Sequence, residues 1–172
     1  YRNWVLVLLA IVYAVNFIDR QIVSVLALDL KRDLGLSDAD LGFLYGTAFG
    51  VFYALFGIPM GRLADSWNRV RLISAGLAVW SAMTALSGLS RTGGQLVAAR
   101  IGVGIGEATA SPGAYSLISD YFPREKRASA LAVYSSGMYI GAGLSLFLGA
   151  SVVKQWNAAF PTGWLGLVGW QA

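Results

Sequence analysis

Residues 4–29 read WVLVLLAIVYAVNFIDRQIVSVLALD, an apolar run with two ionisable residues, Asp19 and Arg20, deep inside it. A helix needs about 20 mainly apolar residues to cross the hydrocarbon core of a bilayer. The run is long enough to do so. It is too long for a cleavable signal peptide and has no small-residue cleavage site, so we interpret it as a permanent membrane span.

Four further stretches meet the same criterion, at about 39–60, 70–89, 95–119 and 128–152. The segment 153–172 is apolar but interrupted by Pro161 and several glycines, and we expect an outer loop leading to an incomplete sixth helix. The predicted fold class is therefore all-α, a polytopic membrane helix bundle. An odd number of spans also predicts that the chain is part of a larger protein.

The start of the second span carries its own signal. Ser37 and Asp40 form a capping-box pattern. Leu36 and Leu41 flank it at the positions of a hydrophobic staple. The pattern predicts that this helix begins near Asp38.

The composition supports a membrane protein and excludes several classes. The chain is 56% hydrophobic and 13% charged, whereas soluble domains are about 45–50% apolar and about 25% charged. Cysteine and histidine are absent, which excludes disulfides, Cys/His zinc sites and Ser-His-Asp catalysis. There is no phosphate-binding loop, and the net charge of +4 is not gathered on the basic face that nucleic acid requires. We expect no enzyme, no metal, no cofactor and no nucleic-acid partner.

Basic residues indicate the orientation, because they concentrate on the cytoplasmic side of membrane proteins. Seven of them lie near the N-terminus and in the 61–71 and 120–127 loops, against four on the other side. The sequence therefore predicts a multi-pass protein of the inner or plasma membrane with a cytoplasmic N-terminus.

Small residues recur every four positions in three spans. They are Gly42, Gly46, Gly50 and Ala54; Gly102, Gly106, Ala110 and Ala114; and Gly137, Gly141, Ser145 and Gly149. Such stripes let the backbones of neighbouring helices approach closely. We expect a compact bundle whose smooth contacts allow rocking.

Four ionisable residues lie inside predicted spans: Asp19, Arg20, Arg100 and Glu107. Each costs about 2.5–3.5 kcal/mol at a helix centre, so mutual neutralisation is expected. Depth along the helices places Asp19 within reach of Arg100, and Arg20 within reach of Glu107. Two interpretations remain, a buried lock that fixes helix register and a network coupled to an ion or substrate. We favour the network, since intramembrane carboxylates beside bases are typical of proton relays.

The loop GRLADSWNRVR at 61–71 resembles the signature between the second and third helices of the major facilitator superfamily. The matching residues are Gly61, Leu63, Ala64, Asp65 and Arg69. Asn68 replaces a glycine, and we expect it to tolerate the left-handed turn. We also expect Asp65 to cap a helix end and pair with Arg69. The resemblance implies that Gly61, Asp65 and Arg69 form a conformational latch.

Four further segments resemble the spinster subfamily of that superfamily. They are NFIDRQ (16–21), RIGVGIGEA (100–108), SPGAYSLISDYFPREKRASAL (111–131) and GMYIGAGL (137–144). The resemblance covers nearly the whole chain but only the first half of a twelve-span fold of two six-helix bundles. It implies alternating access with a cavity between the halves. The implied partners are a lysophospholipid- or sphingolipid-like amphiphile, protons, membrane lipids and a C-terminal bundle of the same protein.

The same resemblance implies roles for individual residues. Asp19 and Glu107 would couple protons, with Arg20 and Arg100 as their charge partners. Ala142 stands where many proton-coupled relatives have proline, which departs from their pattern. Candidates for the lining of the substrate cavity, each of which also suits ordinary packing, are Tyr13, Phe17, Tyr45, Phe49, Tyr53, Ser111, Tyr134 and Tyr139.

The sequence thus predicts a proton-coupled transporter that moves a lysolipid-like molecule by alternating access. Two alternatives remain. One is a transporter of the same superfamily for a small organic anion or sugar, with Arg20 and Arg100 binding the anion. The other is a membrane scaffold that transports nothing.

Overall fold

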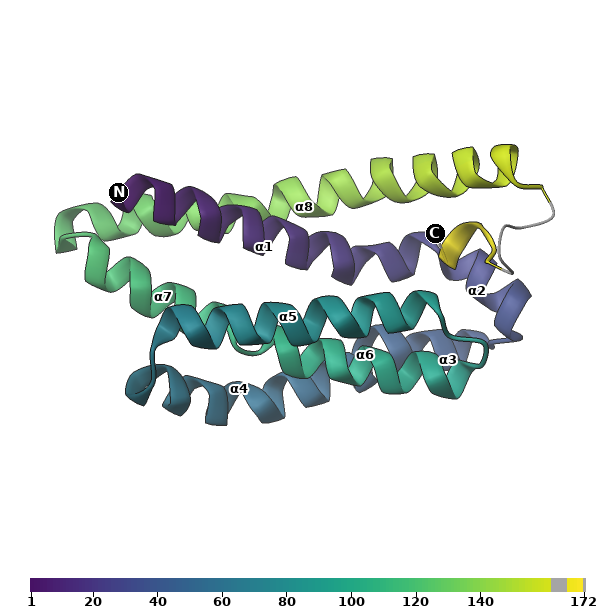
Figure 1. Ribbon diagram of the computed structural model, residues 1–172, viewed down its shortest axis with the longest axis horizontal. Coiled ribbons are helices and arrows are strands. Elements are labelled where there is room, and N and C mark those ends of the chain that lie inside the picture. The colour runs from purple at the N-terminus through teal and green to yellow at the C-terminus, as the bar shows by residue number, and fades with distance from the viewer. Residues whose placement is uncertain (162–166, 172) are drawn as a thin grey trace.

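The computed structural model describes residues 1–161 and 167–171, and its regular structure is helical. The elements are α1 (Arg2–Val25), α2 (Ala27–Leu34), α3 (Asp38–Gly42), η1 (Phe43–Ala48), α4 (Phe49–Ser66), α5 (Arg69–Gly88), α6 (Gly93–Glu107), α7 (Ala110–Tyr121), α8 (Arg124–Ala159) and η2 (Gly169–Gln171). Figure 1 shows them as one elongated bundle with its long helices side by side. The predicted all-α bundle is confirmed.

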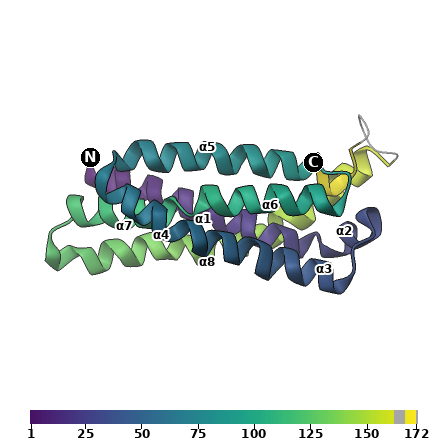
Figure 2. The same cartoon turned by 90° about the horizontal axis from the view of Figure 1, so that it is seen from below.

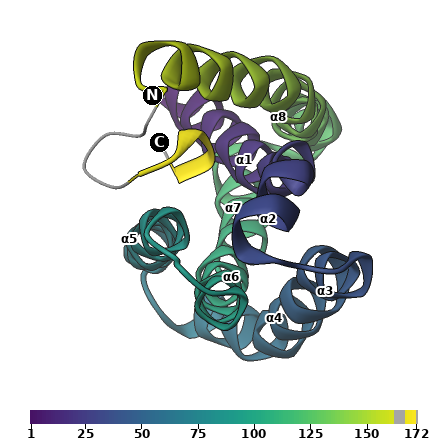
Figure 3. The same cartoon turned by 90° about the vertical axis from the view of Figure 1, so that its right-hand side faces the viewer.

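The bundle has two groups of helices joined by the fourth span. In the end-on view of Figure 3, α1 and α8 lie together on one side, and α4, α5 and α6 lie on the other. Helix α6 packs against α5 and α4, whereas α7 also contacts α1 and α8. The fourth span therefore crosses from one group to the other.

The N-terminus and the turns α4–α5 and α7–α8 share one end of the bundle (Figure 1). The turns α2–α3 and α5–α6 and the helix η2 lie at the other end, as Figure 2 also shows. The predicted basic loops thus lie at the same end as the N-terminus.

Four helical segments of the described chain are long and apolar enough to cross a membrane: Arg2–Val25, Asp38–Ser66, Arg69–Gly88 and Arg124–Ala159. They correspond to four of the five predicted spans. The second begins at Asp38, as predicted, because the capping box forms: Asp40 N donates to Ser37 Oγ at 3.2 Å, and Ser37 N donates to Asp40 Oδ2 at 2.9 Å.

The predicted fourth span, 95–119, is not one continuous helix. It divides into α6 and α7, with Ala108 and Thr109 between them. Pro112 explains the break, because it has no N–H for the carbonyl of Ala108 and its ring clashes with that carbonyl. Glu107 is consequently the last residue of α6, at the point where the span is broken.

The helix of the fifth predicted span extends beyond the expected bounds of about 128–152. Helix α8 continues to Ala159, so the expected outer loop of 153–172 begins with helix. The helix ends where Pro161 disfavours helical geometry for the preceding residue, and Phe160 indeed has φ −132° and ψ 73°. Residues 162–166 and 172 of that expected loop lie outside the described residues.

Two of the predicted small-residue stripes make close helix contacts. A Cβ on Gly106 would lie 2.7 Å from Trp80 N on α5, and a Cβ on Gly102 would lie 2.6 Å from the Met83 side chain. On α8, a Cβ on Gly137 would lie 2.6 Å from the Ala10 carbonyl oxygen of α1. The stripes of α6 and α8 therefore bring α5 and α1 close.

The stripe of the second span does not pack in this way. A Cβ at Gly42, Gly46 or Gly50 would meet nothing within 4 Å in the described chain. The close packing expected of this face is absent because none of the described helices covers it.

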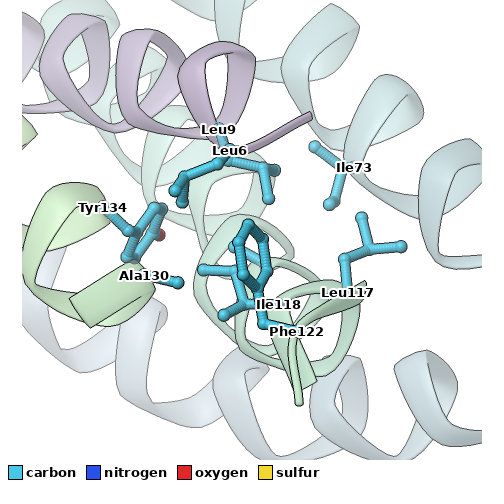
Figure 4. Packing of buried hydrophobic residues seen from close by; sticks show 9 residues of the cluster. Leu6, Leu9, Ile73, Leu117, Ile118, Phe122, Ala130 and Tyr134 are labelled. Carbon is cyan, nitrogen blue, oxygen red and sulfur yellow. The ribbon is translucent and has the colours of Figure 1, made fainter. Parts of the chain in front are cut away.

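A cluster of apolar side chains holds the end of the bundle that contains the N-terminus (Figure 4). Leu6 and Leu9 of α1 meet Ile118 of α7 and Phe122, which directly follows α7, and Tyr134 of α8 closes the cluster. A second cluster at the other end includes Val23, Leu30, Leu41, Leu44, Leu96 and Trp170.

Gly141→Ala is expected to destabilise the bundle by about 1–3 kcal/mol, the usual cost of overpacking. Its Cβ would lie 2.9 Å from the Ala14 carbonyl carbon, and a backbone group cannot move aside as a flexible side chain does. Gly143→Ala on the same helix is the control, because nothing lies within 4 Å of that Cβ. Thermal unfolding in detergent measures both. Equal stability of the two variants would contradict the tight α1–α8 contact.

Candidate functional site: two buried ion pairs beside a cavity

The first ion pair joins α1 to α6. Arg100 Nη1 donates to Asp19 Oδ2 at 3.0 Å, and Arg100 Nη2 donates to the Asp19 carbonyl oxygen at 3.2 Å. Both side chains are buried, with 5% and 7% of their surface exposed. An unpaired charge at this position would be very costly in an apolar environment, so each residue depends on the other.

The second ion pair lies beside the first. Arg20 Nε donates to Glu107 Oε2 at 2.7 Å. The Glu107 side chain is fully buried, whereas 24% of the Arg20 side chain is exposed. Both pairs expected from helix depth are therefore present, and their geometry is confirmed.

Helix geometry explains why adjacent residues choose different partners. Asp19 and Arg20 are neighbours on α1, so their side chains diverge by about 100°. Arg100 and Glu107 lie two turns apart on α6, and Glu107 sits at its broken end. Each residue of α1 thus meets the opposite charge at a different point along α6.

Three aromatic rings surround the Arg20 guanidinium. Its central carbon lies 4.6 Å from the Tyr53 ring centroid, 4.8 Å from that of Phe49 and 5.2 Å from that of Phe17. Cation–π contacts of this kind stabilise a cation that has lost part of its water. The rings therefore hold Arg20 in place at the edge of the buried region.

Six predicted cavity residues lie in this aromatic region. Phe49 stacks on Tyr53 at 5.7 Å, and the Tyr53 hydroxyl lies 3.4 Å from Ser111 Oγ. A second group follows α1, with Tyr13 stacked on Tyr134 at 4.4 Å and edge-on to Phe17 at 5.1 Å. Phe17 links the groups through its contact with Arg20.

The other two predicted cavity residues, Tyr45 and Tyr139, lie outside this aromatic region. The Tyr45 hydroxyl donates to the Val23 carbonyl at 3.0 Å, close to the junction of α1 and α2. Tyr139 is 73% exposed and is not brought together with the other candidates. It lies two residues from both Gly137 and Gly141, about 200° around the helix from the face that packs on α1.

A cavity of about 290 Å³ opens next to the ion pairs. Its lining residues are Arg20, Gln21, Val23, Ser24, Leu44, Tyr45, Phe49 and Arg100. Arg20 and Arg100 both line this space, while Asp19 and Glu107 are not in its lining. The cavity therefore presents cations and aromatic surface, a combination suited to an anion attached to an apolar body.

One residue of the charge network was missed by the sequence analysis. Thr84 of α5 donates its hydroxyl to Asp19 Oδ1 at 3.0 Å. Both carboxylate oxygens of Asp19 thus accept a hydrogen bond. By contrast, Glu107 Oε1 is buried and has no hydrogen-bond partner among the described residues. Several hydroxyl residues lie along α5, and no sequence pattern distinguishes Thr84 from them.

The predicted contacts of the 61–71 loop are not formed. Arg69 Nη1 donates to Asp120 Oδ2 at 2.7 Å instead of pairing with Asp65, which is exposed. Asn68 is extended, with φ −68° and ψ 111°, and its side chain caps α5 by accepting from Arg71 N at 3.0 Å. Asp65 does not cap this helix because Asn68 already occupies the cap position, and no left-handed turn is needed.

The chain has helices long enough to cross a membrane, one broken span, and ion pairs inside the bundle. These features define a polytopic membrane protein, and charged residues inside such bundles are typical of transporters. Residues 9–170 match the model of the Major Facilitator Superfamily, and the chain belongs to this family. The family is one of transporters and not of enzymes.

Among curated proteins, the chain is 37% identical over 163 residues to an MFS-type efflux pump of Mycolicibacterium smegmatis, a match that covers 92% of this chain and 38% of the pump. It is 31% identical over 171 residues to a probable L-galactonate transporter of Escherichia coli, covering 96% and 38%. It is 30% identical over 164 residues to the protein spinster of Drosophila melanogaster, covering 93% and 27%.

Solved structures also include close matches to the chain. The chain is similar to a bacterial homolog of the human lysosomal transporter spinster in its inward-facing, occupied conformation, with a TM-score of 0.92 and 37% identity. The unoccupied inward-facing form gives 0.93. These matches cover 99% of this chain and 40% and 39% of the solved chains. The chain thus spans less than half the length of its relatives, and its spinster-like fold is confirmed.

Proposed function

We propose that the chain is the N-terminal bundle of a secondary transporter that works by alternating access. The observation that supports this proposal most directly is the double ion pair beside a cavity between α1, α6 and the second span. A purely structural lock would not need two guanidinium groups at the border of an open space. The C-terminal bundle would supply the other wall of the substrate site.

The proposed driving force is a proton gradient acting on Asp19 and Glu107. Asp19 has a hydrogen-bond donor on each carboxylate oxygen, Thr84 on Oδ1 and Arg100 on Oδ2. Glu107 Oε1 has no donor in the described chain, so a proton added there breaks no hydrogen bond. The two acids therefore differ in the hydrogen bonds that an added proton would disturb.

The proposed substrate is a lysophospholipid- or sphingolipid-like amphiphile. Its charged headgroup would meet Arg20 and Arg100, and its tail would run along the aromatic residues from Phe49 toward Phe17 and Tyr13. The resemblance of the sequence to the spinster subfamily implies this substrate class, and the matches to spinster proteins agree with that resemblance.

A small organic anion is the second candidate. The cavity volume of about 290 Å³ suits a small molecule, and both of its cationic residues could bind one carboxylate. The relative named as a probable L-galactonate transporter supports this alternative.

The orientation and the latch are also proposals. The N-terminus would face the cytoplasm of a cell that carries the protein in its inner or plasma membrane, because the basic loops share its end of the bundle. Gly61, Asp65 and Arg69 would form a latch with the other half. The Arg69–Asp120 pair, which ties α5 to α7, supports a fixed loop geometry.

Uptake by the full-length transporter in proteoliposomes tests the proposed function. With an imposed pH gradient, we expect accumulation of a lysophospholipid or sphingoid probe in preference to galactonate and glucose. Preference for galactonate would establish the second candidate instead. Failure of every probe to accumulate, with correctly folded protein, would favour a scaffold.

A further inference from the structure

The hydrogen bonds of the Asp19 carboxylate come from two different kinds of donor. Arg100 Nη1 donates to Oδ2 at 3.0 Å, and Thr84 Oγ1 donates to Oδ1 at 3.0 Å. The guanidinium comes from α6 and the hydroxyl from α5. Asp19 is thus the point at which three helices meet through polar groups.

These donors respond differently when the carboxylate takes a proton. Arginine has only N–H donors, so it cannot accept a hydrogen bond from a protonated acid. A threonine hydroxyl both donates and accepts. If a proton adds to Asp19 Oδ1, the new O–H donates to Thr84 Oγ1. The threonine hydrogen then rotates to a backbone carbonyl one turn earlier in α5, a bond that helical threonine readily forms.

We propose that Thr84 is a positioning residue for proton coupling: its hydroxyl keeps the Asp19 carboxyl bonded to α5 in both protonation states, whereas the contact of Asp19 Oδ2 with Arg100 changes from an ion pair to a weaker hydrogen bond with a neutral acceptor when the proton arrives. The inference rests on the proposed function, because it assigns a proton to Asp19. No atom is gained or lost except that proton. The pair Asp19–Arg100 changes from zero net charge to +1.

The other charged groups around Asp19 are accounted for. Arg20 is its neighbour on α1, and Arg100 and Glu107 face it from α6. The ionisable residues of α5 are Arg69 and Arg71, both in its first turn and about 20 Å along the helix from Thr84. Thr84 is therefore the contact of Asp19 on α5 that stays neutral while it changes its hydrogen bond.

The experiment follows the Asp19 proton directly in the full-length transporter. The infrared carbonyl stretch of a protonated carboxyl is recorded against pH and assigned by its absence in Asp19→Asn. Thr84→Val removes the hydroxyl and keeps the shape, Thr84→Ala removes it with a smaller side chain, and Thr84→Ser retains it. Ser81→Ala, an exposed position on the same helix, is the control.

We expect Thr84→Val and Thr84→Ala to raise the midpoint pH of the Asp19 band. The ionised carboxylate loses a charge-assisted bond, which is worth more than the neutral bond lost by the protonated acid. The expected change is about fivefold to tenfold in proton affinity. Thr84→Ser and Ser81→Ala should keep the wild-type midpoint.

An unchanged midpoint in both hydroxyl-free variants would overturn the inference, as would a Thr84→Ser midpoint shifted as far as that of Thr84→Val. Absence of any Asp19 band at every pH where the protein is folded would overturn it too. The proposed function fails separately, if the Asp19 band titrates normally but a pH gradient drives no uptake.

Discussion

Asp19→Asn in the full-length transporter is expected to abolish accumulation driven by a pH gradient while substrate binding persists. Asparagine has nearly the same shape as aspartate, and its oxygen can still accept the Thr84 hydroxyl. It cannot gain or lose a proton, so it fixes the site in the neutral state. The link between protonation and the Asp19–Arg100 ion pair is then lost.

The measurement compares uptake with and without an imposed gradient, and binding at two pH values. We expect the variant to equilibrate substrate across the membrane without concentrating it, and its binding to lose pH dependence. Asp38→Asn, at an exposed position at the start of α3, should accumulate substrate as the wild type does. Retained gradient-driven accumulation in Asp19→Asn would place the proton elsewhere, and Glu107, whose Oε1 has no hydrogen-bond partner among the described residues, would be tested next.

The ion pairs were predictable because they depend on two quantities that the sequence contains, the depth of each residue along its helix and the cost of an unpaired charge. Helix periodicity also separated the packing face of α6, with Gly102 and Gly106 toward α5, from the face of Arg100 and Glu107. Both quantities can be worked out from a single helix, or from two helices whose directions are known.

The missed features depend on how the helices sit around one another. Arg69 pairs with Asp120, 51 residues away, because α5 and α7 meet at the same end of the bundle. A local pairing with Asp65 was equally compatible with the sequence. Thr84 and the exposed position of Tyr139 follow from rotations of α5 and α8 that apolar sequences fix poorly.

The break in the fourth span is a different kind of error. Pro112 was visible in the sequence, but the apolar run on both sides of it dominated the prediction of a single span. A proline inside a membrane helix is tolerated when nearby groups satisfy the freed backbone. Next to the break, Thr109 N and Thr109 Oγ1 both donate to the Gly106 carbonyl, at 3.3 Å and 2.9 Å, and so satisfy a carbonyl of the last turn of α6. The break places Glu107 at a helix end beside Arg20.

Arg20→Met is expected to lower the free energy of unfolding by about 3–5 kcal/mol, the usual cost of leaving one member of a buried ion pair unpaired. Glu107 is fully buried and would lose its one ionic contact at Oε2. The cost should fall at low pH, where Glu107 takes a proton. Glu107→Met should cost less, because the 24% exposed Arg20 side chain reaches the cavity and keeps its three aromatic contacts.

The double variant Arg20→Met/Glu107→Met separates a structural lock from a functional network. Replacing both charges by apolar groups is often neutral for stability, so we expect unfolding within about 1 kcal/mol of the wild type. Unfolding in detergent gives the coupling energy, and uptake is measured on the same preparation. A double variant that folds but does not transport supports a functional pair. One that transports normally would show that the pair only fixes helix register, and an Arg20→Met variant as stable as the wild type would contradict the ion-pair argument itself.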